Sequence, residues 1–295
     1  MKEKKEMQKR TDRIIAAVCI FIVTVCLIFG VCFKYRFRLA EPVFVEQNTA
    51  VTVFYEEDEE RPGWYADITL CYITGRGDNR RLKSVEFPEL GLHEVMREFS
   101  ESPKVQNQYV VHTVSGRIPV SVQENSDGYK VITRGKVVYT DGSEAETGLG
   151  NLVLAPGPMD TEMGEVVSSS SSSDGKDEMV VRIKGDAKLN IKQVLSPDES
   201  FGTFSITVNG RKLAVEPDQE KEGFIKLKEG DTLTLQSQWN GDNAYNTPSG
   251  LLSSIVILEL EGRVKQTLLY VHAVLQPAGG NFINIWKYLN QRGVF

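Results

Sequence analysis

Hydrophobic positions in this chain follow three different patterns. Near the start, residues 14–33 form an unbroken uncharged run of 20 residues. Later stretches alternate apolar and polar residues, which is the period of a strand with one buried face. Near the end, apolar residues recur three and four positions apart, which is the period of an amphipathic helix. The patterns predict one long apolar helix, two groups of strands and one short C-terminal helix.

The uncharged run predicts a helix that spans a membrane. Twenty helical residues rise about 30 Å, which matches the hydrocarbon core of a bilayer. A cleaved signal peptide usually has an apolar region of about 7–15 residues followed by small residues. Here Lys34, Tyr35 and Arg36 follow instead, and no A-x-A-like site is present. We therefore expect an uncleaved single-pass anchor at 14–33, integral to the cell membrane.

Charges on either side of the run predict its orientation. Six cationic residues precede it and three follow it: Lys2, Lys4, Lys5, Lys9, Arg10 and Arg13 before, then Lys34, Arg36 and Arg38. Cytoplasmic flanks carry the excess of Lys and Arg. We expect residues 1–13 to form a cytoplasmic tail and the bulk of the chain to lie outside the cytoplasm.

One stripe of the apolar helix is built from small residues. Its positions are three and four apart: Ala16, Cys19, Val23, Cys26 and Gly30. Small stripes allow two membrane helices to approach closely, so self-association through this helix is one hypothesis. The alternative is that a lone anchor carries these residues without any partner.

Alternating stretches predict a mainly β protein with two antiparallel β-sandwiches of immunoglobulin-like or jelly-roll type. The first covers residues 39–155, where only 92–100 (LHEVMREFS) looks helical. The second covers residues 179–278, in which Asn209-Gly210 is a strong hairpin signal. Between them, residues 156–178 contain six consecutive serines among Gly, Pro and acidic residues. That composition predicts a flexible linker about which the two sandwiches can reorient.

The segment 279–295 predicts a short amphipathic helix that begins after Asn281. Its apolar face consists of Phe282, Ile285, Trp286 and Leu289. A helix this short is marginally stable alone, so it must pack on another surface. It either packs on the second sandwich or docks on a partner or a membrane surface.

Composition narrows the class of partner. Residues 39–295 carry 25 Lys or Arg and 37 Asp or Glu, a formal net charge of −12. Such a body does not suit nucleic acid, which requires a basic surface. Cys71 is the only cysteine outside the apolar run, so no internal disulfide is expected. This cysteine usage favours a bacterial surface over a small disulfide-rich secreted module.

Sequence motifs for catalysis are absent from the chain. It contains no H-E-x-x-H, G-x-S-x-G, P-loop or Rossmann glycine pattern, and only three isolated histidines. Cys71 superficially resembles the sortase cysteine, but that family places its histidine earlier, and all three histidines here follow Cys71. We predict no catalytic residues, no metal site and no cofactor. A carboxylate pair brought together from distant strands would give an envelope hydrolase, which is the third functional alternative.

One loop has the composition of a ligand site. It combines aromatic rings with amide and carboxylate groups in Trp239, Asn240, Asp242, Asn243, Tyr245 and Asn246. Aromatic rings stack on sugar faces while polar groups hold hydroxyls, so a glycan- or cell-wall-binding surface protein is the second hypothesis. In the other interpretation the segment is a turn whose Trp239 fills the core. The first hypothesis is a non-enzymatic membrane-anchored protein that binds other proteins, as an accessory subunit of a bacterial envelope assembly or as a surface-binding module.

Overall fold

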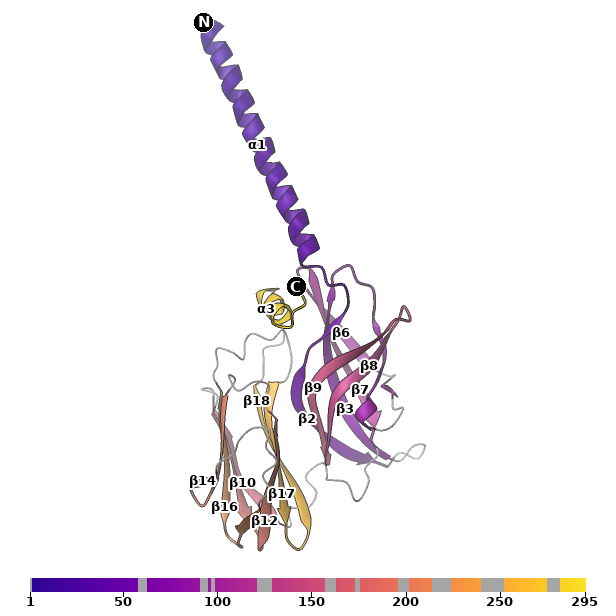
Figure 1. The fold of residues 1–295 in the computed structure, drawn as a ribbon, viewed down its shortest axis with the longest axis vertical. Helices are drawn as coiled ribbons and strands as arrows, with labels where there is room; N and C mark the ends of the chain where they lie inside the picture. Colours follow the sequence, from indigo (N-terminus) through magenta and orange to yellow (C-terminus); the bar gives the residue numbers. More distant parts are fainter. Residues whose placement is uncertain are drawn as a thin grey trace.

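Strands dominate the structure, a computed structural model of the 295-residue chain. The described residues are 2–57, 63–90, 95–96, 99–120, 129–156, 163–172, 176–195, 202–213, 224–239, 252–274 and 282–295. A long N-terminal helix leads into two strand-rich bodies, and a short helix lies near the C-terminus (Figure 1). The prediction of a mainly β chain with one apolar N-terminal helix and one short C-terminal helix is confirmed.

Helix α1 extends over Lys2–Arg36 and projects away from the rest of the molecule (Figure 1). Its stretch Ile14–Cys32 is long and apolar enough to cross a membrane, and none of it is buried within the chain. The small-residue stripe from Ala16 to Gly30 is exposed as well. The predicted apolar helix is therefore confirmed, as the central part of a longer helix.

The first sandwich has two layers of strands. Its elements are β1 (Val43–Phe44), β2 (Gln47–Glu56), β3 (Gly63–Gly75), β4 (Leu82–Glu86), the 3-10 turn η1 (Pro88–Leu90), β5 (Val95–Met96), β6 (Phe99–Gln106), β7 (Tyr109–Pro119), β8 (Lys130–Tyr139) and β9 (Glu144–Pro156). One layer pairs β6 with β7, β7 with β3 and β3 with β1, and the other runs β9-β8-β4-β5. Strand β2 joins the layers because it pairs antiparallel with β3 and parallel with β9.

Strand β3 is buried on both faces at its C-terminal end. Its residues Ile68, Leu70 and Tyr72 point into the main core between the two layers. Its alternate residues Cys71 and Ile73 point the other way into a second apolar cluster. Successive side chains of a strand face opposite sides, so the continuous run at 70–73 requires a cover on each side. The outer cover is described below.

The helix expected over 92–100 is wrong where the structure describes this stretch. Val95–Met96 is β5, and residues 99–100 begin β6. Strand β6 pairs with β7 along its whole length, from Phe99 opposite Gly116 to Gln106 opposite Tyr109. This long-range pairing outweighs the weak local helix preference of the segment.

The second sandwich comprises a five-stranded sheet facing a four-stranded layer. Its strands are β10 (Gly164–Ser171), β11 (Lys176–Ile183), β12 (Ala187–Leu195), β13 (Gly202–Val208), β14 (Arg211–Leu213), β15 (Ile225–Leu227), β16 (Thr232–Trp239), β17 (Leu252–Glu261) and β18 (Lys265–Val274). One sheet has the order β10-β11-β16-β13-β14, and the other layer runs β15-β12-β17-β18. Leu252 of β17 also pairs in parallel with Asn48 of β2, so this layer is continuous with the strands of the first sandwich. The predicted Asn209-Gly210 hairpin is present, with φ of 48° and 77°, and joins β13 to β14.

The serine-rich segment differs most from its prediction. Residues 164–171 form strand β10, which pairs antiparallel with β11 from Gly164 opposite Ile183 to Ser171 opposite Asp177. The predicted flexible linker over 156–178 is therefore wrong where this range overlaps β10 and the start of β11. Serine has little apolar surface to bury, but its backbone pairs as any other does once β11 supplies the partner groups.

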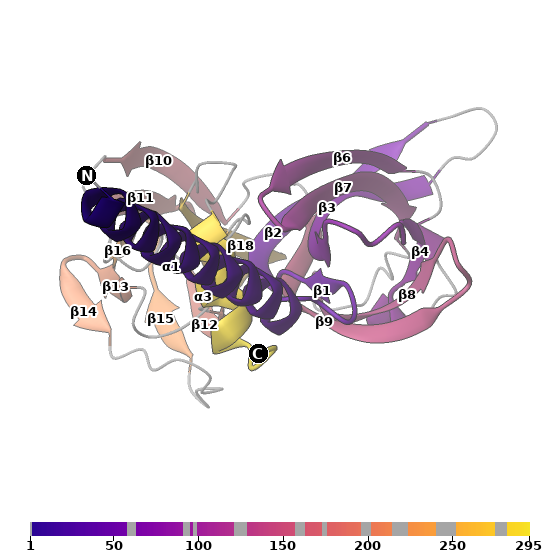
Figure 2. The same ribbon diagram turned by 90° about the horizontal axis from the view of Figure 1, so that it is seen from above.

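The two sandwiches also share an apolar contact. Ile255 and Ile257 of β17 pack with Val153 of β9 and Leu195 of β12. The alternate residues of β17, Val256 and Leu258, face the core of the second sandwich. The run IVILEL therefore supplies apolar side chains to both faces of one strand, and the bodies lie side by side (Figure 2). This contact opposes the free reorientation expected from a linker.

Candidate functional site beside helix α1

The end of the first sandwich from which α1 emerges is here called the α1-proximal end. Helix α3 (Phe282–Gln291) lies across it, near the end of α1 and the C-terminus (Figure 1). Ile285 and Leu289 are fully buried against the outer side of β3 and β7. This helix is the outer cover that Cys71 and Ile73 require.

Aromatic contacts extend this packing to the segment that follows α1. Phe37 meets Trp286 edge-on at 6.3 Å between ring centroids, and meets Phe295 edge-on at 5.5 Å. Tyr109 stacks on Phe282 at 5.8 Å. Such pairs add about 0.5–1.5 kcal/mol each beyond the burial of their area. Phe37, the first residue after α1, thus packs against residues from the C-terminal end of the chain.

Polar contacts fix the orientation of α3. The hydroxyl of Tyr288 accepts a hydrogen bond from the backbone N–H of Glu46 at 3.0 Å and donates to the carbonyl of Phe44 at 3.4 Å. Arg292 forms an ion pair with the Glu46 carboxylate. Burial raises the pKa of the Tyr288 hydroxyl, although the hydrogen bond from Glu46 opposes this effect. These contacts tie α3 to the strands around residue 45.

The apolar face predicted for partner docking is thus used within the chain. Ile285 and Leu289 are buried, and Phe282 and Trp286 are partly buried. The other expectation was packing on the second sandwich, whereas the cluster that holds α3 comes from the first. Helical periodicity identified the face of α3, but it contains no information about which surface receives that face.

A cavity of about 1210 Å³ lies between the end of α1 and the loops at this end. Its lining includes Val31 and Tyr35 of α1 and the cationic residues Arg38, Arg76 and Arg80. Arg80 is paired with Asp78, whose carboxylate oxygen lies 2.8 Å from the guanidinium. Burial alone would raise the pKa of Asp78, but the hydrogen bonds from Arg80 outweigh it and lower that pKa. The cavity is locally basic on a body that is acidic as a whole.

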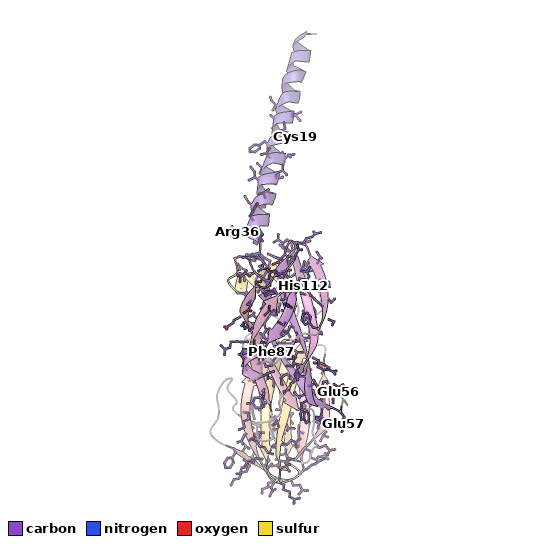
Figure 3. All side chains as sticks on the ribbon, turned by 90° about the vertical axis from the view of Figure 1, so that its right-hand side faces the viewer. Cys19, Arg36, Glu56, Glu57, Phe87 and His112 are labelled. Carbon is purple, nitrogen blue, oxygen red and sulfur yellow. The ribbon has the colours of Figure 1, made fainter. Side chains whose placement is uncertain are left out.

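A buried polar cluster lies beneath this end, around His112 of β7 (Figure 3). Its Nδ1 lies 2.6 Å from Glu101 Oε1, and its Nε2 lies 2.9 Å from Thr74 Oγ1. The imidazole stacks on Tyr72 at 4.4 Å, and the Tyr72 hydroxyl donates to Glu101 at 2.9 Å. Burial lowers the pKa of His112, which keeps the ring neutral, while the nearby Glu101 carboxylate acts in the opposite direction.

The order hydroxyl, imidazole, carboxylate is the arrangement that activates a nucleophile in several hydrolases. Here Thr74 and His112 are completely buried. Neither lines the cavity described above. A substrate has no access to the Thr74 hydroxyl in this conformation, so the geometry supports a structural role that joins β3, β6 and β7. Sequence reasoning missed this cluster because only the strand register places Tyr72 opposite His112.

The remaining predicted site residues contribute no assembled site. Trp239 ends β16, and the rest of the proposed ligand loop, Asn240 to Asn246, lies outside the described residues. Glu56, the first of five consecutive acidic residues at 56–60, forms an ion pair with Arg117 at 2.7 Å and lies away from His112 (Figure 3). Cys71 is buried in the cluster under α3. Within the described part of the chain, no three His, Cys, Asp or Glu side chains gather as metal ligands.

Comparisons with known proteins do not assign the chain to a family. No family model matches it, and no curated protein matches it. Solved structures with a partial likeness include a protein of unknown function from Porphyromonas gingivalis W83, at 9% identity over 79% of this chain and 99% of that one, with a TM-score of 0.28. A chicken TCR has 14% identity over 80% and 100%, with a TM-score of 0.22. The MSCRAMM ACE of Enterococcus faecalis has 9% identity over 82% and 96%, with a TM-score of 0.22. Scores this low carry no functional argument.

Proposed function

We propose that this chain is a single-pass membrane protein that displays two β-sandwiches outside the cell and acts by binding other proteins. It serves as a non-enzymatic accessory subunit of a bacterial envelope assembly or as a surface-binding module. One observation carries the proposal. The exposed apolar stretch Ile14–Cys32 runs without a break into a body that incorporates the residues immediately after the helix.

The junction between helix and body supports retention of the helix. Phe37 and Leu39 follow α1 directly and belong to the cluster under α3. The hydroxyl of Tyr109 also donates to the carbonyl of Phe37 at 3.1 Å. The body therefore begins within a few residues of the apolar stretch. It would rest close to the membrane surface, with the excess of cationic flanking residues favouring a cytoplasmic N-terminus.

The non-enzymatic part of the proposal rests on the buried cluster. The arrangement closest to a catalytic one, Thr74–His112–Glu101, is closed to substrate. Its hydrogen bonds link three strands, which is a sufficient reason for a buried histidine and carboxylate to be present. Because the polar cluster closest to a catalytic arrangement has a structural role, we propose that the protein acts through its exposed surface.

Two measurements on the natural chain test anchoring and orientation. Alkaline carbonate extraction of membranes should leave the protein in the pellet, and its intact mass should include the segment 14–33. Protease added to intact cells should digest the sandwiches but leave the N-terminal tail. A released chain that begins after residue 33 would contradict the proposal, as would full protection of the sandwiches.

Binding to proteins is tested by crosslinking in native membranes, followed by isolation of the tagged chain and mass spectrometry. Truncation of α3 is a poor control because it uncovers the first sandwich. Trp239→Ala is the better comparison. Crosslinked protein partners retained by this variant would support the proposal. Recovery on purified cell wall alone, lost in Trp239→Ala, would favour the glycan hypothesis instead.

A further inference from the structure

Strand β10 forms one edge of the five-stranded sheet and carries exposed side chains. Every residue from Glu165 to Ser171 is exposed, including Val166 and Val167 at 49% and 47%. Both faces of the strand are therefore open to solvent, and none of the other described strands pairs with its outer edge. Its side chains between Val166 and Ser171 are uncharged.

The free edge presents unpaired backbone groups in a regular pattern. The N–H of Ser172 donates to the carbonyl of Lys176 at 2.8 Å, so this pair faces β11. Alternate residues of an antiparallel strand point their N–H and C=O groups to opposite sides. Ser170 and Ser168 therefore bond to β11, opposite Glu178 and Val180. Ser169 and Ser171 direct their N–H and C=O groups away from the sheet.

Most other edge strands of the described chain carry protection that β10 lacks; the exception is β18, which has ten residues, no proline and Lys265 at one end as its only Lys, Arg, Asp or Glu residue. Strand β14 has only three residues, two of them Arg211 and Lys212. Strand β15 also has three residues and contains a lysine. Strand β6 is as long as β10 but contains Pro103, Lys104 and the inward-pointing Glu101. Short length, proline and charge are the means by which proteins prevent unwanted pairing at an edge.

We infer that β10 receives an extended segment of another protein as an added strand. Main-chain hydrogen bonds to Ser169 and Ser171 would provide affinity, as in other cases of strand addition. The small serine side chains place no bulk in the way of an approaching backbone. This inference rests on the proposed function, because it assigns the binding surface of a displayed protein.

A second copy of this chain in the same membrane does not fit the edge. Antiparallel pairing of two β10 strands requires a two-fold axis perpendicular to the sheet. The strands of the second sandwich run roughly along the long axis of the molecule, as α1 does (Figure 1). Such an axis would therefore point the two α1 helices in opposite directions. Copies anchored in one membrane cannot pair in this antiparallel way, and two bodies that each carry a net charge of −12 repel each other in a parallel arrangement, so the added strand belongs to a different protein.

Charge defines the chemistry of the added strand. The body has a net charge of −12. Glu165 at one end of β10 lies opposite Arg182 and 3.7 Å from Lys184, and Glu178 on β11, opposite Ser170, accepts a hydrogen bond from Gln236. The charge preference therefore comes from the acidic body as a whole, which a segment with an uncharged, β-branched centre and flanking Lys or Arg residues would complement. Acidic segments would be repelled.

The test uses the full chain in lipid nanodiscs and a phage-displayed library of linear decapeptides as the probe. Ser169→Pro removes the outward N–H, as Pro103 does in β6, and leaves the bonds to β11 in place. Ser169→Thr is the matched control because it keeps that N–H. Selected peptides should be basic at their ends, and should bind the natural chain and Ser169→Thr alike. Ser169→Pro should weaken binding by about tenfold or more.

Hydrogen exchange supplies a second readout. Bound peptide should slow exchange at the amides of Ser169 and Ser171. Ser171→Pro repeats the test at the second outward position if Ser169→Pro does not fold with the melting temperature of the control. Failure to enrich any peptide, or equal binding by the proline variants, would overturn the inference. Neither result would alter membrane retention or orientation, so failure of the proposed function remains separately detectable.

Discussion

The α1-proximal end and the β10 edge differ in how far their apolar side chains and backbone groups are covered. At the α1-proximal end, α3 covers the outer face of β3, and Pro103 and Lys104 protect the edge of β6. At β10, an eight-residue strand has no charge beyond Glu165 and no proline. The same chain therefore protects one edge fully and leaves another open.

This difference indicates where the chain meets other molecules. Apolar surface at the α1-proximal end is removed from water by the chain itself, so it contributes to stability. Unpaired backbone at β10 contributes nothing to stability and remains available to a partner. A single proline or lysine is enough to discourage pairing at an edge strand. The lack of both in the eight-residue strand β10 therefore indicates an edge that is available to a partner.

The largest expected effect is at Leu289. Leu289→Ala should lower the free energy of unfolding by about 2–5 kcal/mol, because it leaves a cavity in the cluster under α3. Ile283→Ala is the matched control on the same helix, since Ile283 is 55% exposed, and it should change stability by about 0.5 kcal/mol or less. Chemical denaturation measures both. Equal small effects would mean that α3 does not pack on the first sandwich.

Glu101 should come next. Glu101→Ala removes the acceptor of both His112 and Tyr72 and should cost about 2–3 kcal/mol. Glu56→Ala is the control, because the exposed pair of Glu56 with Arg117 should contribute about 1 kcal/mol or less. A loss at Glu101 no larger than at Glu56 would show that the buried cluster is not formed.

Acid should destabilise the protein through His112. Burial lowers its pKa in the folded chain, so the unfolded chain binds the proton first as pH falls. Stability should decline below about pH 6.5, the ordinary histidine pKa, with a slope of at most about 1.4 kcal/mol per pH unit from this group. Denaturation between pH 7 and 5 measures it, and His112→Gln should remove this contribution. An unchanged slope in that variant would assign the pH dependence elsewhere.

The smallest effect should be at β10. Ser170→Lys should alter the free energy of unfolding by about 0.5 kcal/mol or less, because the side chain is exposed. Lysine at this position would give β10 the protection that β6 already has. A loss above about 1.5 kcal/mol would indicate that β10 is covered rather than open.

Sequence patterns predicted the positions of the helices and strands better than the contacts between them. The uncharged run, the alternating strands, the Asn209-Gly210 hairpin and the apolar face of α3 all follow from local periodicity. The strand at 164–171 does not, because serine composition describes side chains and not the backbone pairing with β11. The destination of α3 and the contact of Tyr72 with His112 depend on strand register across the first sandwich, which no local pattern encodes.

Photocrosslinking in native membranes tests the central claim most directly. A photoreactive residue at position 170 in β10 should form adducts with another protein, whereas one at position 104 in β6 should form few or none. Both positions are exposed and lie on edge strands. Adducts at 170 alone would support a displayed protein that binds through its open edge. Adducts at 104 alone, or none at either position, would contradict it.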